Sequence, residues 1–424
     1  MQRIGYSTVY LFAWWLCIVS MPWYVLPHSI SVVLLLGVWL AGGNFPEKWS
    51  HLKSKTWVWP FIIFFFLHVI GLLYSEDMAS AIFNIETKLS LILLPLIAAT
   101  GPILSNGSFR LLKNSFIGSC LVVSLASLIA AMNSFLHPAG PVLNFDPYTT
   151  EKFHSLFPTL ARGWEYFSYG QLSQWIEIHP AFFSMYLILC ILIIMQGIFD
   201  EQRTNFFQVV LIIFFISFIS LLASRMAVVS LIVTVTFLVL HHSYLKKRLL
   251  RGLSVLSFLL VLTFFFIWIN PVSRFRVWIE PMTASLTADE HTAHWNSINL
   301  HLLSWKASSG STDTNWPFGA GTGDGQHVLY NYYASLGILG FKANAHNQYL
   351  QTFIELGIVG VISLSFCLYA PAYRAFKNNP LHFAFIVLFG MMCLSESMLV
   401  RPMGIAFFAM FQSLFLCNKA QGHE

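Results

Sequence analysis

The sequence predicts an all-α polytopic membrane protein with about 12 transmembrane helices. Of the 424 residues, 57% are hydrophobic and only 10% are charged, and the mean hydropathy is +0.68. Soluble domains do not have this composition, and a membrane-spanning helix needs roughly 20 predominantly apolar residues. Apolar runs such as 209–222 and 255–269 lack the polar–apolar alternation of membrane β-barrels. We therefore expect one integral membrane domain over residues 1–424.

The hydrophobic segments follow one another closely, with two long polar interruptions. The predicted spans are Tyr6–Leu26, Ser29–Ala41, Trp57–Tyr74, Leu89–Leu104, Phe116–Leu136, His179–Phe199, Phe206–Ala223, Met226–His241, Leu253–Ile269, Asn347–Ala370, Leu381–Ser395 and Met403–Leu416. The interruptions are the loops 137–178 and 271–345. They leave the membrane on the same side, and the larger one lies between the ninth and tenth spans.

Basic residues set the predicted orientation. Most of them lie in short loops on one side, Lys246, Lys247 and Arg248 among them. Short cytoplasmic loops carry such an excess, so we expect both termini in the cytoplasm. The net charge of +5 follows from this bias and does not argue for nucleic acid. The six cysteines lie in or at the edge of spans, which predicts neither outer disulfides nor a thiolate metal site.

The loop 137–178 is rich in aromatic residues, including Trp164, Tyr166, Phe167 and Tyr169. Tryptophan and tyrosine favour the headgroup level of a bilayer, which predicts an interfacial belt. The alternative is a surface that stacks on sugars or covers a lipid.

The loop 271–345 contains two predicted helices, around 297–306 and 328–333, with a glycine-rich turn at 319–325 between them. The glycines lack the Gly-Lys-Ser/Thr ending of a nucleotide-binding loop, and no strand precedes them. A tight turn is the favoured interpretation. Its backbone N–H groups could alternatively bind an anion.

Three arginines lie at outer-side ends of predicted spans. Arg225 occupies a nearly absent turn between two apolar runs, and Arg274 and Arg276 follow the ninth span. A lone arginine at such a depth is often an interface anchor, but by default it is also a functional-site hypothesis. The planar guanidinium suits phosphate, so the three together predict an anionic headgroup ligand.

A histidine marks the point where the large loop re-enters the membrane. His346 is expected to begin the tenth span, with Asn347 near the cap. A helix N-terminus disfavours imidazolium, so His346 is predicted to stay neutral and able to accept a proton. The alternative is a hydrogen-bonded structural histidine.

Other charged residues complete the predicted site. Glu355, about 13 Å further along the helix, is an intramembrane carboxylate that needs a partner, and Gln351 four residues earlier can supply one. Glu396 and Arg401 flank the last outer turn, where a structural ion pair is expected.

These residues resemble the signature of the O-antigen ligase/polymerase superfamily. The carriers of the resemblance are AHNQYL at 345–350, ELGIVG at 355–360, Trp305 with PFGAGTG at 317–323, Ser224-Arg225 at an outer turn, and the closing Glu396 with RPMG at 401–404. The resemblance implies a GT-C-like membrane glycosyltransferase in the bacterial inner membrane, with its active site facing the periplasm. It implies no metal and no cofactor.

The implied donor is a glycan on undecaprenyl diphosphate, and the implied acceptor is lipid A-core. His346 would deprotonate the acceptor hydroxyl and Arg225 would bind the departing diphosphate, with inversion at the anomeric carbon. The family places a second arginine shortly before the loop tryptophan, where this chain has His301. That departure implies either that Arg274 or Arg276 takes the role or that the geometry of the bound donor differs from the family's.

The leading expectation is an O-antigen ligase. An O-antigen polymerase, which extends a lipid-linked repeat, shares the same motifs, and a protein O-oligosaccharyltransferase is a third alternative. From another class, a lipid-linked glycan flippase or transporter should show broken helices around a midplane site in corresponding halves. The concentration of polar residues in one late outer loop favours an enzyme.

Overall fold

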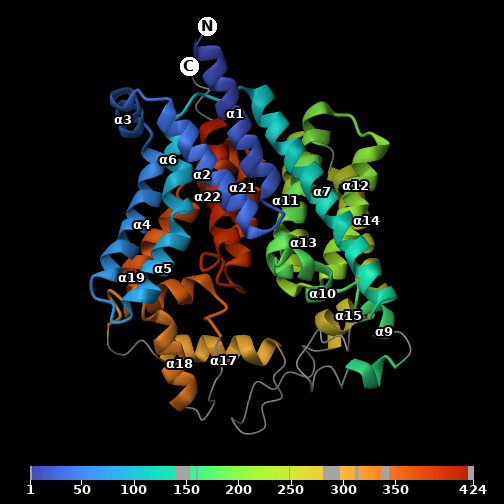
Figure 1. Cartoon of the computed structure of the whole chain (residues 1–424). Helices are drawn as coiled ribbons and strands as arrows, with labels where there is room; N and C mark the ends of the chain where they lie inside the picture. The colour runs from blue at the N-terminus through green and yellow to red at the C-terminus, as the bar shows by residue number, and fades with distance from the viewer. Residues whose placement is uncertain are drawn as a thin grey trace. The chain divides into compact units, whose positions relative to one another are not determined.

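The computed structural model describes residues 2–138, 153–158, 161–247, 249–279, 297–310, 315–335 and 343–418 (Figure 1). Within these ranges every regular element is helical and none is a strand, which confirms the predicted all-α class. Parts of both long loops, residues 139–152 and 159–160 of the first and 280–296, 311–314 and 336–342 of the second, lie outside the described residues.

The chain divides into two compact units. Unit 1 comprises residues 1–116, 303–374 and 393–424, and unit 2 comprises residues 117–302 and 375–392. His346, Glu355, Glu396 and Arg401 belong to unit 1. The three arginines and His301 belong to unit 2.

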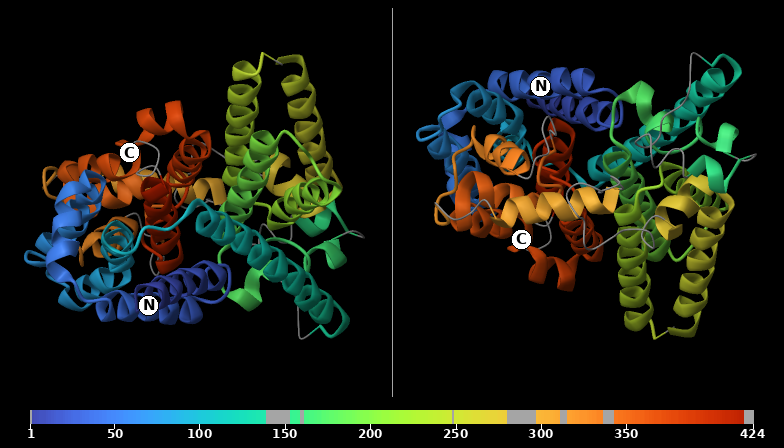
Figure 2. Two further views of the ribbon diagram at one scale, coloured as in Figure 1. Left: turned by 90° about the horizontal axis from the view of Figure 1, so that it is seen from above. Right: turned by 90° about the horizontal axis from the view of Figure 1, so that it is seen from below.

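Unit 1 contains helices from both ends of the chain. They are α1 (Gln2–Ser20), α2 (Val25–Ala41), α3 (Phe45–Ser54), the 3-10 turn η1 (Thr56–Val58), α4 (Trp59–Leu72), α5 (Met78–Lys88), α6 (Ser90–Thr100), the start of α7 (Asn106–Leu136), the later part of α17 (Ser297–Gly310), α18 (Gly325–Ser335), α19 (Gln348–Tyr369), the start of α20 (Ala372–Asn378), and α22 (Pro402–Asn418). Helices α1 and α2 lie side by side in both views of Figure 2. Helix α4 packs on α19, and α6 packs on α22.

Aromatic rings fill the interior of unit 1. Phe61 of α4 stacks on Phe408 of α22 with ring centroids 5.6 Å apart, and Phe116 meets Phe411 edge-on at 4.8 Å. The Tyr10 hydroxyl donates to the carbonyl of Ile97 at 2.9 Å. Lipid tails are as apolar as these side chains, so close packing and hydrogen bonds between helices hold the unit together.

Unit 2 is built around α11, whose residues 180–195 are all buried. Its elements are most of α7, α9 (Ala161–Trp164), α10 (Tyr169–Ser173), η2 (Gln174–Ile176), α11 (Pro180–Glu201), α12 (Phe206–Leu222), α13 (Arg225–Leu245), α14 (Leu249–Ile269), α15 (Pro271–Arg274), the π-helical turn η3 (Phe275–Ile279), the first residues of α17, the later part of α20, and α21 (Pro380–Met392). α12 and α13 both pack on α11, and α13 also packs on α21.

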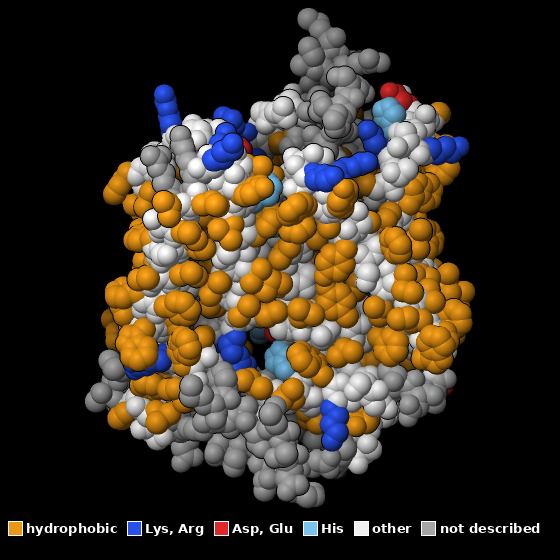
Figure 3. All heavy atoms as spheres, turned by 180° about the vertical axis from the view of Figure 1, so that it is seen from behind, with side chains coloured by type: hydrophobic (Ala, Val, Ile, Leu, Met, Phe, Trp, Pro, Cys, Tyr) orange, Lys and Arg blue, Asp and Glu red, His pale blue; other side chains and the backbone are white. Residues whose placement is uncertain are grey.

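Six helices among the described residues are long and apolar enough to cross a membrane, or up to seven if α2 and α3, bent by 111°, form one broken span. Five further apolar helices are 10–17 residues long. The membrane class is thus confirmed, while the count of 12 stays a prediction. On the face in Figure 3, hydrophobic side chains cover the middle and lysine and arginine side chains gather above and below.

One predicted span boundary is wrong in a way that bears on the site. The sequence predicts that the fourth span starts at Leu89, which leaves Lys88 in a loop. Instead α5 and α6 form one candidate span, Met78–Thr100, and the Lys88 side chain within it is 2% exposed. A lysine is costly inside a membrane, and its acceptance depends on a carboxylate that lies far away in the sequence.

Candidate functional site

His346 lies in a turn held just outside α19. Its φ is +45°, a left-handed conformation that costs a residue with a side chain on the order of 1 kcal/mol or more. Asn347 caps the helix by accepting hydrogen bonds from the N–H groups of Tyr349 and Leu350 at 2.9 and 3.2 Å. The predicted cap is confirmed, but the helix begins at Gln348, so His346 precedes it.

Residues 393–399, which follow α21, form hydrogen bonds with the start of α19 next to this turn. The Gln348 N–H donates to the carbonyl of Cys393 at 2.8 Å, and the Asn347 side-chain amide donates to that of Leu394 at 3.2 Å. The Leu399 N–H donates to the Gln348 side-chain oxygen at 2.6 Å. These bonds fix residues 393–399 against the start of α19 and so bring Glu396 to His346.

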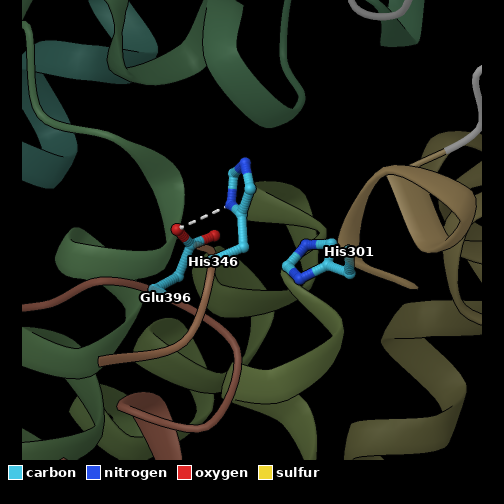
Figure 4. A group of neighbouring side chains, drawn as sticks. All are labelled: His301, His346 and Glu396. Atoms are coloured by element: carbon cyan, nitrogen blue, oxygen red, sulfur yellow. Dashed lines mark ion pairs between the residues drawn. The ribbon is translucent and has the colours of Figure 1, made fainter. Parts of the chain in front are cut away.

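The Glu396 carboxylate lies beside the His346 imidazole, within ion-pair distance (Figure 4). The His346 Nδ1 atom lies 3.5 Å from Glu396 Oε2, and their side chains are 27% and 18% exposed. The sequence predicts Arg401 as the ion-pair partner of Glu396, and this prediction is wrong. Arg401 is exposed at the start of α22, where its carbonyl accepts the N–H groups of Gly404 and Ile405. A carboxylate at one imidazole nitrogen orients the ring and leaves the other nitrogen for a substrate.

His301, the third residue labelled in Figure 4, lies on α17 in unit 2 and is half-buried. Later on the same helix, Trp305 belongs to unit 1. Its indole Nε1 donates to the His346 carbonyl at 3.4 Å. The tryptophan singled out from the sequence therefore contacts the turn that carries the histidine.

Glu355 has the partners that its depth in the membrane requires. The side-chain amide of Gln351 donates to it at 2.7 Å, as predicted. Lys88 Nζ and His68 Nδ1 each lie 3.8 Å from its other oxygen. The exposed fractions are 3% for Glu355, 2% for Gln351 and 1% for His68. Sequence reasoning missed Lys88 and His68; the signal for Lys88 was a lysine between apolar runs.

The glycine-rich turn fills a break in α19. At Gly357 the helix is interrupted by φ +62° and ψ −160°. The carbonyls of Ile354 and Glu355 accept the N–H groups of Ala320 and Gly321 at 2.8 and 3.0 Å. Beyond the break, the Ile358 N–H donates to the carbonyl of Trp316 at 3.0 Å. The turn supplies the hydrogen bonds that the interrupted helix lacks.

The rest of the turn is tied to the end of α4 and the start of α5. The Thr322 hydroxyl donates to the carbonyl of His68 at 2.7 Å, and the Asp324 carboxylate accepts the N–H groups of Glu76 and Asp77 at 2.7 and 2.8 Å. The N–H groups of residues 319–324 all donate to protein oxygens. The tight turn is confirmed, and these groups are not available to cradle a phosphate.

In unit 2, Arg276 supports the turn that carries Arg225. Ala223 and Ser224 connect α12 to α13, which begins at Arg225. Arg276 Nε donates to the Ala223 carbonyl at 3.1 Å, and its guanidinium stacks 3.8 Å above the ring of Tyr169. The nearly absent turn at Arg225 is thus confirmed, and Arg276 is 7% exposed.

Arg274 has a different environment. Its guanidinium lies over the rings of Phe157 and Trp268, at 4.7 and 5.3 Å. Residues 271–273 are buried, although the sequence predicts the start of an aqueous loop there. They pack because the Asn270 side chain caps α15 by accepting the Val272 N–H.

Unit 2 also contains an apolar groove of about 450 Å³. It is lined by side chains of α7, α9, α12 and α14, among them Phe135, Trp164, Leu221 and Phe266. Its lining residue Leu221 lies near the C-terminal end of α12, four residues before Arg225 in the sequence.

Comparison with known proteins gives one family. Residues 208–365 match the family model described as O-antigen ligase. The match includes Arg225, Arg274, Arg276, His301 and His346, and it supports the superfamily indicated by the motifs. No curated protein matches the chain.

Proposed function

We propose that this chain, whose residues 208–365 match the O-antigen ligase family, joins a glycan from undecaprenyl diphosphate to lipid A-core. The reaction takes place at the periplasmic face of the bacterial inner membrane, with both termini in the cytoplasm. The observation that carries the proposal is the pairing of His346 with Glu396 at 3.5 Å. It provides an oriented base at the mouth of a membrane helix.

In the proposed reaction, His346 takes the proton from an acceptor hydroxyl as its oxygen attacks the anomeric carbon. The bond from that carbon to the diphosphate oxygen breaks, so the configuration inverts and undecaprenyl diphosphate leaves. Glu396 stabilises the imidazolium that forms, as a carboxylate does in a catalytic triad. The proton then passes from His346 to water. No step requires a metal or a cofactor, so transfer should persist in a chelator.

Arg225 is proposed to bind the diphosphate. Negative charge grows on the leaving oxygens in the transition state, where a guanidinium is most effective. The hydrogen bond and stacking of Arg276 hold the turn on which Arg225 stands, so we assign Arg276 to positioning. The apolar groove beside α12 suits the polyprenyl tail of the donor.

The transporter alternative is disfavoured by the way α19 is broken. Transporters leave the backbone groups of a broken helix for substrate and ions. Here the carbonyls of Ile354 and Glu355 and the N–H of Ile358 are bonded to residues 316–321. The break is therefore structural and offers no substrate site.

The test uses the purified protein in detergent or vesicles with lipid-linked glycan and lipid A-core. His346→Ala should lower transfer by a factor on the order of 10² to 10⁴, the usual contribution of a general base. His327→Ala is the matched control, because His327 lies on α18 of the same loop with a side chain that is 61% exposed. Wild-type transfer by His346→Ala would refute the mechanism.

The choice of acceptor separates ligase from polymerase. A ligase attaches glycan to lipid A-core and leaves a second lipid-linked repeat unextended, whereas a polymerase does the reverse. In cells, deletion of a ligase gene removes all attached glycan and lets lipid-linked polymer accumulate. Deletion of a polymerase gene leaves core carrying a single repeat.

A further inference from the structure

A continuous line of buried polar contacts leads from the membrane interior to the turn of His346. The Lys88 ammonium lies 3.8 Å from the Glu355 carboxylate, which accepts a hydrogen bond from the Gln351 side-chain amide at 2.7 Å. The oxygen of that amide accepts the Ala345 N–H at 3.1 Å. The next residue is His346. All five residues of this line belong to unit 1.

The carboxylate determines which way the Gln351 amide points. An ionised carboxylate only accepts hydrogen bonds, so the NH₂ end of the amide must face it. The oxygen end is then directed at the Ala345 N–H, which needs an acceptor because Ala345 is fully buried. With a neutral group at position 355 the amide could turn over, and its NH₂ would then face the Ala345 N–H, donor against donor.

The line ends at a backbone conformation that needs support. His346 has φ +45°, and such conformations persist where the surroundings over-determine them. Asn344 Oδ1 accepts the His346 N–H at 3.0 Å, and Trp305 donates to the His346 carbonyl. The bond from Ala345 to Gln351 fixes the peptide that precedes the histidine.

We propose that Lys88, Glu355 and Gln351 are positioning residues for His346: the buried charge pair orients the Gln351 amide, and the amide sets the turn that aims the imidazole. The catalytic consequence rests on the proposed function, in which His346 is the base. The positioning itself is a property of the fold. Through these contacts Lys88, inside an apolar span, influences the orientation of the His346 side chain, which it does not contact directly.

A simpler interpretation is that Glu355 only neutralises Lys88. The two interpretations differ in what they require at position 351. Charge compensation needs a carboxylate 3.8 Å from Lys88 and does not depend on the hydrogen bond of the Ala345 N–H. Positioning needs an acceptor for that N–H and a hydrogen bond between positions 351 and 355.

The decisive variant exchanges the two side chains. In Gln351→Glu/Glu355→Gln, the new carboxylate accepts the Ala345 N–H and the new amide donates to that carboxylate, so both hydrogen bonds and the net charge are kept. Gln351→Met keeps the volume and loses both bonds. Positioning predicts that kcat falls at least tenfold in Gln351→Met with donor KM within about threefold of wild type, and that the exchange restores kcat to within about threefold.

A readout without the transfer reaction separates this proposal from the proposed function. Diethyl pyrocarbonate modifies exposed imidazoles, and peptide mass spectrometry gives the rate at each histidine. The rate at His346 should change at least threefold in Gln351→Met and return in the exchange variant, while His327 stays constant. Gln412→Met, at another buried glutamine of unit 1 on α22, should leave both rates unchanged.

The outcomes are distinct. Wild-type kcat and His346 reactivity in Gln351→Met would overturn the positioning role. If Gln351→Met does not fold, the exchange variant decides, because a folded exchange variant with kcat still tenfold low supports charge compensation alone and overturns the proposal. If the wild-type protein transfers no glycan but the His346 rates behave as stated, the proposed function fails and the positioning stands.

Discussion

Replacing Gly357 with alanine tests how α19 is built. The backbone at Gly357 has φ +62° and ψ −160°, a region that only glycine adopts readily, at a cost of roughly 1–3 kcal/mol for other residues. A Cβ atom there would lie 2.4 Å from both the carbonyl carbon and the oxygen of Pro317 and 2.5 Å from the Phe318 nitrogen. All three are backbone atoms, so the added methyl group must displace the chain.

The displacement removes hydrogen bonds that nothing else can replace. The Ile358 and Val359 N–H groups donate to the carbonyls of Trp316 and Pro317 at 3.0 and 3.4 Å. A backbone N–H group left unpaired inside a membrane, including one that faces lipid, costs roughly 1–3 kcal/mol or more. Together with the backbone strain, the free energy of unfolding should fall by an amount on the order of 5 kcal/mol, which is comparable to the whole stability of many domains.

The six free cysteines, five of them buried, allow a thiol-reactive dye to report unfolding in detergent. We expect Gly357→Ala to lower the melting temperature by at least about 5 °C and to lose transfer. Gly37→Ala is the control: Gly37 lies inside α2, and a methyl group added there would have no atom within 4 Å, so alanine should stabilise by about 0.5–1 kcal/mol. Equal melting of the two variants would refute this account of the break.

Three further results are expected. Glu396→Gln should lower kcat on the order of tenfold or more, because the imidazolium that forms on His346 in the proposed reaction loses a stabilising carboxylate 3.5 Å away; a wild-type kcat would remove Glu396 from the mechanism. Arg276→Lys should raise the donor KM several-fold, since lysine cannot both stack flat on an aromatic ring and donate from Nε; binding assays with lipid diphosphate measure this. The Ser80 N–H and hydroxyl hold the pKa of the Asp77 carboxyl below its usual value. The stability that the carboxylate contributes is therefore present above that usual value and is lost as the pH falls through the lowered pKa, so melting curves between about pH 2 and 5 should lose this dependence in Asp77→Asn.

Features that depend on neighbouring residues are predictable from the sequence. The helical class follows from apolar runs, the cap at Asn347 from its place before a helix, and the bond between Gln351 and Glu355 from their four-residue spacing. The tight turn before Arg225 follows from the absence of a longer polar segment between the two apolar runs. Each inference needs only a few residues of sequence.

Features that depend on tertiary packing are not predictable in this way. The sequence suggests Arg401 as the partner of Glu396 because they are five residues apart, yet clamping of residues 393–399 onto α19 brings Glu396 to His346. The burial of Lys88 has no local explanation because its partner Glu355 lies on another helix. The helix break at Gly357 has no local signal either, since glycine is common in membrane helices.

The bond between the glycine-rich turn and the segment before α5 has a consequence for synthesis. Asp324 accepts the N–H groups of Glu76 and Asp77, which precede it by 248 and 247 residues. The sequence separation between Lys88 and its partner Glu355 is larger still. At 5–20 residues per second, the ribosome needs roughly 12–50 s to make the missing part. During that interval Lys88, which lies inside a candidate membrane span, lacks the Glu355 carboxylate. The contacts of unit 1 that join Lys88 to Glu355 therefore cannot form before about residue 360 has been translated.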